Sequence, residues 1–110
     1  MTYQHAGLAA GRWSRLTFVE QMANVGSEVE RALHWRAKHR PDYAQRAFER
    51  ALELIDLTLA DAQRPTRLKE LARVREAMVD DFAGANLYGS TDASWKQYFL
   101  AFAYAARSTR

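Results

Sequence analysis

The sequence predicts an all-α protein, an up-down-up-down four-helix bundle. Apolar residues recur at helical spacing in separate segments, Pro or Gly residues fall between those segments, and no strand-like alternation occurs in the 110 residues. The connections are short, so consecutive helices should lie antiparallel to one another. We therefore expect a flexible leader over residues 1–12 and a single four-helix domain over 13–110.

The first helix is expected over about residues 18–38. Thr17 and Glu20 form a T-x-x-E capping box at its start, and apolar residues then recur on one face. Gly26 and Ser27 in its middle weaken the helix, since Gly costs about 1 kcal/mol relative to Ala. We interpret these two residues, with Ala23, as a shallow patch where another helix approaches closely. A break in the helix is the alternative.

Two prolines separate the next helices. Pro41 suits the first turn of a second helix over about 42–61, and Pro65 marks the next break. We expect Thr66 to be the N-cap of a third helix over about 67–83. Gly84 stands where a left-handed C-terminal cap belongs.

The fourth helix, over about 93–107, is capped by Ser90, Thr91 or Asp92. Its segment QYFLAFAYAA carries no charge over ten residues. A helix that is apolar on all sides is central in a core or covered by a partner, and a helix of a four-helix bundle normally keeps a solvated face. We therefore expect a homo-oligomer whose interface is formed by Tyr98, Phe99, Phe102 and Tyr104.

Composition limits the class of protein. Hydrophobic residues make up 48% and charged residues 26%, as in a soluble globular domain. The absence of cysteine excludes disulfides, thiolate metal ligands and a cysteine nucleophile. The first residues lack the pattern of a signal peptide, and no apolar run reaches the roughly 18 residues of a membrane span. We expect a cytoplasmic protein that does not contact membranes.

Basic residues should gather at one end of the bundle, where the first helix starts, the second linker turns and the chain ends. Such a cluster attracts phosphates through counterion release, and Trp13 within it offers a ring on which a base can stack. Simple solvation of these side chains is the alternative. This surface, called the basic end below, is predicted to bind nucleic acid or an acidic protein through Arg12, Trp13, Arg15, Arg64, Arg67, Lys69, Arg107 and Arg110. The opposite end mixes basic residues with several aspartates.

No catalytic residue, cofactor or metal site is predicted. The chain has no G-x-S-x-G motif and no glycine-rich phosphate loop, and His34 and His39 are not spaced as a metal-binding i, i+4 pair. Glu49, Glu53 and Asp56 form an acidic row, but the Glu-x-x-His motif of di-iron bundles is missing. We interpret this row as a solvated or salt-bridged stripe.

For Asp56, and separately for one loop, a structural and a functional interpretation both remain open. Asp56 has apolar neighbours, so it should pair with an arginine, and the candidates are Arg31, Arg73 and Arg75; a functional role is the alternative. The loop NLYGSTDASW concentrates polar and aromatic residues. Loops of this kind often carry function, but its Tyr88 and Trp95 side chains are equally suited to closing the end of the core.

Four segments carry a resemblance to known proteins: MANVGSEVERALHW, AFERALELIDLTL, RLKELARVREAMVDDF and YGSTDASWKQYFLAFAYAAR. Over about residues 13–107 the chain resembles a family of small bacterial and archaeal all-helical proteins with no assigned activity. More loosely, its size and helical layout resemble the HEPN group. That resemblance implies a dimer, and in many members of the group it implies action beside a nucleotidyltransferase or as an RNA-cleaving toxin.

The motif of the active HEPN members is not matched here. In that motif an Arg is followed by a His, with more than two and fewer than seven residues between them. Here two residues separate Arg31 from His34, and seven separate Arg31 from His39. Our leading hypothesis is a non-enzymatic, dimeric binding or accessory protein that uses the basic end. The alternative is an HEPN-like RNase or toxin-antitoxin component with a non-standard site at Arg31, His34, Arg36 and His39.

Overall fold

The computed structural model describes residues 11–108, which form a short 3-10 turn and four α-helices without any strand. All four helices predicted from the sequence are confirmed, each to within two residues at either end. The expected leader, apart from residues 11 and 12, and Arg110 lie outside the described residues. The elements are η1 (Trp13–Arg15), α2 (Phe18–Ala37), α3 (Pro41–Asp61), α4 (Pro65–Ala83) and α5 (Asp92–Ser108).

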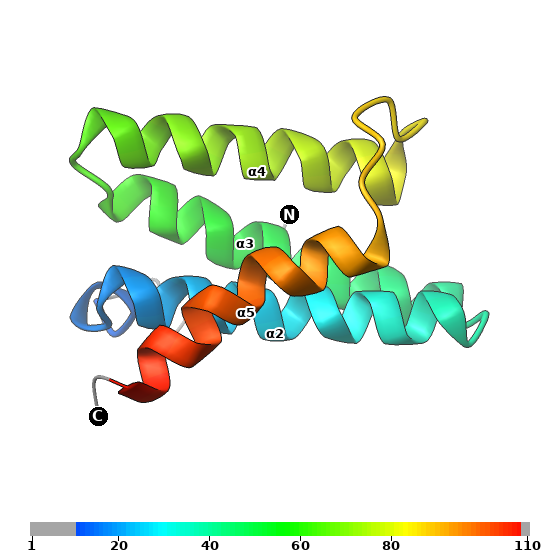
Figure 1. Cartoon of the computed structure of the whole chain (residues 1–110), viewed down its shortest axis with the longest axis horizontal. Coiled ribbons are helices and arrows are strands. Elements are labelled where there is room, and N and C mark those ends of the chain that lie inside the picture. The colour runs from blue at the N-terminus through cyan, green and yellow to red at the C-terminus, as the bar shows by residue number, and fades with distance from the viewer. Residues whose placement is uncertain (1–10, 109–110) are drawn as a thin grey trace.

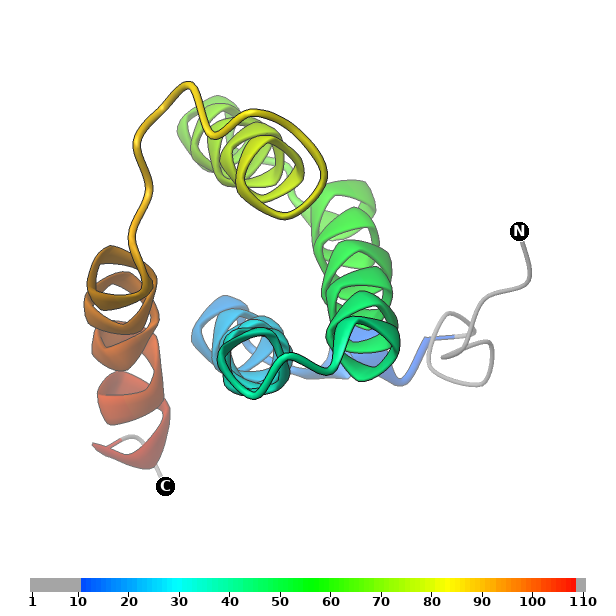
Figure 2. The same cartoon turned by 90° about the vertical axis from the view of Figure 1, so that its right-hand side faces the viewer.

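The helices alternate in direction along the chain (Figure 1). α2 and α3 form the most extensively packed pair, α4 lies along α3, and α5 packs on α2, which it crosses obliquely (Figure 1). In the end-on view the order around the bundle is α4, α3, α2 and α5 (Figure 2). Thus α4 and α5 are each attached mainly to one neighbour. No helix formed by residues 11–108 is both long and apolar enough to cross a membrane.

The core lies between the apolar faces of α2 and α3, with contributions from α4 and α5. Leu33 and Ile55 are completely or almost completely buried at its centre, and Leu71 and Met78 bring α4 onto it. Burying a side chain of this size stabilises the fold by roughly 1.5–3 kcal/mol relative to leaving it exposed. The buried residues of α2, α3 and α4 lie on the faces that the apolar spacing predicts, whereas the spacing in α5 predicts no single face.

The small residues in the middle of α2 allow α5 to approach closely. A Cβ atom built at Gly26 would lie 2.7 Å from the Cβ of Phe99, closer than real Cβ atoms come to a neighbouring atom. The helix continues through Gly26 and Ser27, and the Ser27 hydroxyl donates to the Ala23 carbonyl at 3.2 Å. The predicted close-approach patch is therefore confirmed, and the alternative of a helix break is wrong.

Two predicted N-caps are confirmed. The Glu20 amide donates to the Thr17 hydroxyl at 3.1 Å, and the Glu20 carboxylate accepts from the Thr17 amide at 2.9 Å. Thr91, one of three candidates for α5, exchanges the equivalent pair of bonds with Ser94 at 3.0 and 2.9 Å. Each arrangement satisfies amides that the first helical turn leaves without an acceptor.

The other two predicted caps are wrong. Thr66 lies inside α4, whose N-cap is Arg64, because Pro65 takes the first helical position. Gly84 is extended (φ −119°, ψ −156°) rather than left-handed. The chain turns instead at Asn86 (φ 53°), a residue type that tolerates this conformation, and the Asn86 amide donates to the Asp80 carbonyl at 3.0 Å.

Candidate functional site

The basic end is formed by four segments that lie at one end of the molecule: the residues before and at the start of α2, the α3–α4 turn, the start of α4 and the end of α5 (Figure 1, left). Its described basic side chains are exposed, except for the half-buried Arg67: Arg12, Arg15, Arg64, Arg67, Lys69 and Arg107. Arg110, which the sequence adds to this group, lies outside the described residues.

A hollow of about 250 Å³ lies between the start of α2 and the α3–α4 turn, and Arg64 and Arg67 are among its lining residues. The Arg67 guanidinium lies over the ring of Phe18, 4.3 Å from its centroid, and Phe18 in turn contacts Phe102 of α5 edge to face. An aromatic face holds a cation in place without neutralising its charge. The structure thus orients Arg67 beside the hollow without an ion-pair partner among the described residues, and Asp61 also lines the hollow.

The acids near the basic end are bound to neutral donors. Asp61 accepts a hydrogen bond from the Gln21 amide at 3.1 Å, and Glu70 accepts one from the Tyr98 hydroxyl at 2.5 Å. Glu20 accepts its capping bond from the Thr17 amide. Among the residues that the structure describes, none of the six basic side chains of this end forms an ion pair. Positive charge therefore predominates here.

The N-terminus of α4 adds a further positive element. Its first turn contains no acid, and its N-cap residue Arg64 makes no side-chain capping bond. The first turns of α2, α3 and α5 contain Glu20, Asp42 and Asp92, respectively. The first amides of a helix point outward without an acceptor and carry the positive end of its dipole, so an uncapped N-terminus beside arginines attracts an anion.

Trp13 does not provide a stacking surface, and this part of the prediction is wrong. The side chain is 3% exposed, and its indole N–H donates to the Thr58 hydroxyl of α3 at 3.0 Å. The Trp13 carbonyl accepts from the Gln21 amide at 3.0 Å. A large ring with one polar atom is most stable when the ring is buried and the N–H is bonded, so Trp13 holds the 3-10 turn against α3.

Most of the aromatic side chains of α5 are buried or half-buried by contacts within the chain. Phe99 is 4% exposed and packs against Gly26, so it is a core residue and not a surface on which another subunit can dock. Tyr98 is half-buried; its burial and then its hydrogen bond to Glu70 raise the pKa of the phenol. Phe102 is half-buried against Phe18. Of the four predicted interface residues, Tyr104 alone is widely exposed, at 68%.

At the opposite end, the charges pair with one another. The Arg36 guanidinium of α2 binds Asp81 at the end of α4 at 3.0 Å and Asp92 at the start of α5 at 3.1 Å. The Trp95 indole N–H donates to the Asp81 carboxylate at 2.7 Å. Burial lowers the pKa of Arg36, but the hydrogen bonds and charges of the two aspartates outweigh that effect and raise it. This cluster joins three helices and is structural. The Trp95 side chain is buried and closes this end of the core, whereas the Tyr88 side chain is exposed.

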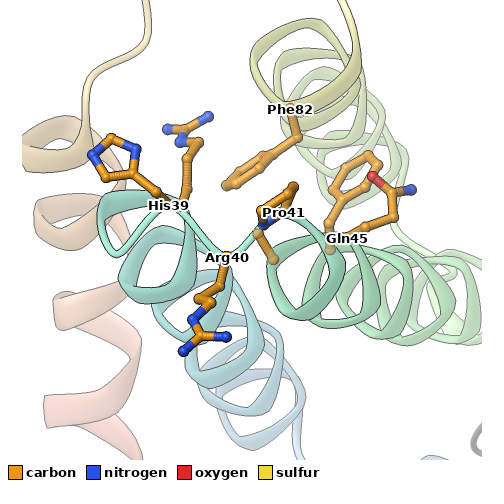
Figure 3. Close-up of a pocket in the computed structure, with 8 residues that line it drawn as sticks. His39, Arg40, Pro41, Gln45 and Phe82 are labelled. Atoms are coloured by element: carbon orange, nitrogen blue, oxygen red, sulfur yellow. The ribbon is translucent and has the colours of Figure 1, made fainter.

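A pocket of about 470 Å³ lies beside this cluster, at the turn between α2 and α3 (Figure 3). Its apolar wall includes Phe48 and Phe82, whose rings are stacked with centroids 5.3 Å apart. Arg36, His39 and Arg40 are among its lining residues, but the His39 and Arg40 side chains point away from Phe82 (Figure 3). The pocket is therefore mainly apolar, with one of its cations already bound to aspartates.

The residues of the alternative RNase site do not all face this pocket. Arg36 and His39 are among its lining residues, but Arg31 and His34 are not. Arg31 binds Glu28 of its own helix at 2.7 Å, and His34 is exposed with its ring against Trp35. The structure thus divides the four residues between two surfaces.

The three residues of the acidic row on α3, Glu49, Glu53 and Asp56, lie in different environments. Asp56 binds Arg75 of α4 at 2.7 Å, which confirms a structural ion pair with one of the three candidates and raises the pKa of Arg75. Glu49 accepts from Gln45 at 3.4 Å. Glu53 is 2% exposed, so of the two alternatives for the stripe, solvated or salt-bridged, the solvated one is wrong at this position. Within residues 11–108, no three His, Asp or Glu side chains are grouped as metal ligands.

Comparison with protein families, with curated proteins and with solved structures finds no match for this chain. The resemblance noted above therefore stays an expectation from the sequence, and it assigns no role to any residue. What the chain does must be argued from its own geometry.

Proposed function

We propose that this protein is a non-enzymatic accessory protein that binds nucleic acid through the basic end. The observation that carries the proposal is the uncapped N-terminus of α4, which has Arg64 and Arg67 beside it and no acid in its first turn. This region combines the backbone amides of Thr66 and Arg67, two guanidinium groups and a neighbouring hollow that Asp61 also lines; Pro65, the first helical residue, has no N–H. Backbone amides and guanidinium groups are the donors that proteins use to hold phosphate.

The contacts expected are to the phosphate backbone. Under this proposal Arg64 and Arg67 bind one phosphate group at the start of α4, and Arg12, Arg15 and Arg107 bind neighbouring phosphates. With Trp13 buried, the base-stacking part of the original hypothesis falls away. Binding through phosphate contacts does not read sequence, and it weakens as salt concentration rises.

The decisive experiment measures binding of the full chain to fluorescently labelled RNA and DNA of the same sequence by anisotropy over a range of salt concentrations. For duplex DNA, the logarithm of the affinity should fall by about 0.9 per phosphate contact for each tenfold increase in salt. Absence of binding to either nucleic acid at low salt would contradict the proposal. An acidic protein would then be the partner that the same charge distribution favours.

A charge-reversal variant tests whether the basic end is responsible. Arg64→Glu with Arg67→Glu should reduce the affinity at least tenfold, because it removes two phosphate contacts and introduces repulsion. Acids in the first turn of a helix are favourable, so this change should leave folding intact. Arg46→Glu with Arg73→Glu is the matched control: it makes the same change in net charge at exposed positions away from the basic end and should reduce affinity far less.

A further inference from the structure

The hollow at the basic end contains a carboxylate as well as two guanidinium groups. Asp61, the last residue of α3, lines it together with Arg64 and Arg67. Within residues 11–108 Asp61 forms no ion pair, although it shares the hollow with the two arginines. The hollow therefore presents a hydrogen-bond acceptor and, separately from it, two cations to a ligand that enters.

The position of the Asp61 carboxylate is fixed by a buried side chain. Gln21 is 3% exposed, and its side-chain amide donates to the Trp13 carbonyl at 3.0 Å and to Oδ2 of Asp61 at 3.1 Å. A glutamine amide has two N–H donors, so both are used. Oδ1 of Asp61 accepts no bond from a described residue. The protein thus holds one carboxylate oxygen and leaves the other able to accept a bond from a ligand.

Asp61 is not placed where an acid stabilises its own helix. The C-terminal end of a helix carries the negative end of its dipole, so an anion there is unfavourable. The last turn of α3 contains no basic residue that would offset this. Residues that break a local rule in this way are expected at functional sites. The location of Asp61 therefore favours a role in binding over a role in folding.

The combination of two cations and an acceptor restricts the chemistry of the ligand. Guanidinium groups donate N–H bonds and suit phosphate oxygens. An ionised carboxylate only accepts hydrogen bonds and repels phosphate, so Asp61 requires a donor beside the phosphate. In RNA every nucleotide carries such a donor on its sugar, the 2′-hydroxyl, whatever its base. The deoxyribose of DNA lacks this hydroxyl.

We propose that the basic end prefers RNA to DNA because Asp61 accepts a hydrogen bond from the 2′-hydroxyl of a nucleotide whose phosphate Arg64 and Arg67 bind. This preference rests on the proposed function and adds to it a selectivity that phosphate contacts do not supply. Asp61 determines the selectivity, and Gln21 positions it. Beside a deoxyribose the carboxylate has no donor and repels the phosphate, so the discrimination acts against DNA as well as for RNA.

The test compares three single-stranded ligands of the same length at one low salt concentration: oligouridylate, oligodeoxyuridylate and 2′-O-methyl oligouridylate. They share the base and the phosphate charge, and only the first has a 2′-hydroxyl donor. The full chain should bind oligouridylate about tenfold more tightly than the other two, as expected for one hydrogen bond to a charged group.

The outcomes separate this preference from the proposed function. Equal affinities for the three ligands would overturn the RNA preference and leave phosphate binding at the basic end intact. Binding of the 2′-O-methyl form as tightly as oligouridylate would also overturn it, because that form cannot donate. Absence of binding to all three ligands would contradict the proposed function itself.

Asp61→Asn tests whether this carboxylate is responsible. The Gln21 amide should keep the Asn oxygen as its acceptor, which leaves the Asn NH₂ group for the hollow and so replaces an acceptor with a donor. The ratio of RNA affinity to DNA affinity should fall from about ten to about one, with a gain in DNA affinity because the repulsion is removed. Glu30→Gln is the matched control, since it makes the same change in net charge at an exposed position of α2 and should leave the ratio unchanged.

A purely structural role of Asp61 would give a different result. Weakening of the contact between α2 and α3 would lower both affinities by the same factor and lower the melting temperature. We expect Asp61→Asn to melt at the same or a higher temperature, because it removes an anion from the C-terminal end of a helix. An unchanged ratio of RNA affinity to DNA affinity in this variant would overturn the role of Asp61. The comparison of the three ligands on the wild-type chain needs no variant.

Discussion

The two ends of this bundle use their basic residues in different ways. At the end formed by the α2–α3 turn, Arg36 is bound by two aspartates from two other helices. At the basic end, the nearby acids Asp61 and Glu70 accept hydrogen bonds from an amide and a phenol. The basic side chains there form no ion pair with any described residue. Charge therefore holds helices together at one end and remains free for a partner at the other.

The contrast has a simple cause in the chain. Asp81 near the end of α4 and Asp92 at the start of α5 lie where α2 ends, so Arg36 meets both when the helices pack. The helix that starts at the basic end, α4, begins with Arg64-Pro65 and has no acid in its first turn. Similar residue types thus give a structural cluster in one place and an exposed cationic surface in the other.

The largest expected effect is a loss of folding stability when the cluster at Arg36 is disrupted. Asp81→Ala should destabilise the fold by about 3 kcal/mol, because it removes the acceptor of the Trp95 indole N–H and one of the two carboxylates that bind the Arg36 guanidinium. Urea unfolding followed by circular dichroism measures this. Asp92→Ala is the comparison; its side chain is 52% exposed, so the cost should stay below about 1 kcal/mol. Equal costs for the two variants would contradict the central role of Asp81.

A smaller effect is expected where an acid at the basic end binds a neutral donor. Tyr98→Phe should cost about 1 kcal/mol near neutral pH, the usual worth of one hydrogen bond. The pKa of Tyr98 in the folded chain is raised above the value of about 10 that it has when unfolded. The folded state therefore keeps a proton that the unfolded state loses, and this contribution is present below pH 10 and is lost as the pH rises further.

Unfolding measured from about pH 8 to pH 11 checks this sign. The difference in free energy of unfolding between wild type and Tyr98→Phe should be constant up to about pH 10 and then decrease as the unfolded phenol ionises. A difference that is the same at all of these pH values would show that the phenol does not titrate differently in the two states.

The smallest expected effect concerns the ion pair between α3 and α4. Both side chains of the Asp56–Arg75 pair are about 40% exposed (38% and 40%). Asp56→Ala should therefore reduce the free energy of unfolding by only about 0.5 kcal/mol, as is usual for exposed ion pairs. High salt should reduce the difference further. A loss of several kcal/mol would mean that Asp56 has a role that its exposed ion pair does not explain.

Much of the fold could be predicted from the sequence because local signals determine it. Apolar spacing gives the four helices and the inner faces of α2, α3 and α4, and Pro41 and Pro65 mark where two of the helices begin. The capping boxes at Thr17 and Thr91 depend only on residues three positions apart. The grouping of basic residues at one end also follows from helix lengths and short connections.

Tertiary structure alone decided which of these residues are accessible. A sequence does not show that Trp13 turns inward to bond Thr58, or that Phe99 lies against Gly26 while Leu100, the next residue, faces outward. In a segment that is apolar on all sides, periodicity cannot say which face is covered. The turn at Asn86, which replaces the expected cap at Gly84, likewise depends on its contact with Asp80. Local patterns fix helices because their hydrogen bonds are local, whereas burial depends on contacts between residues far apart in the chain.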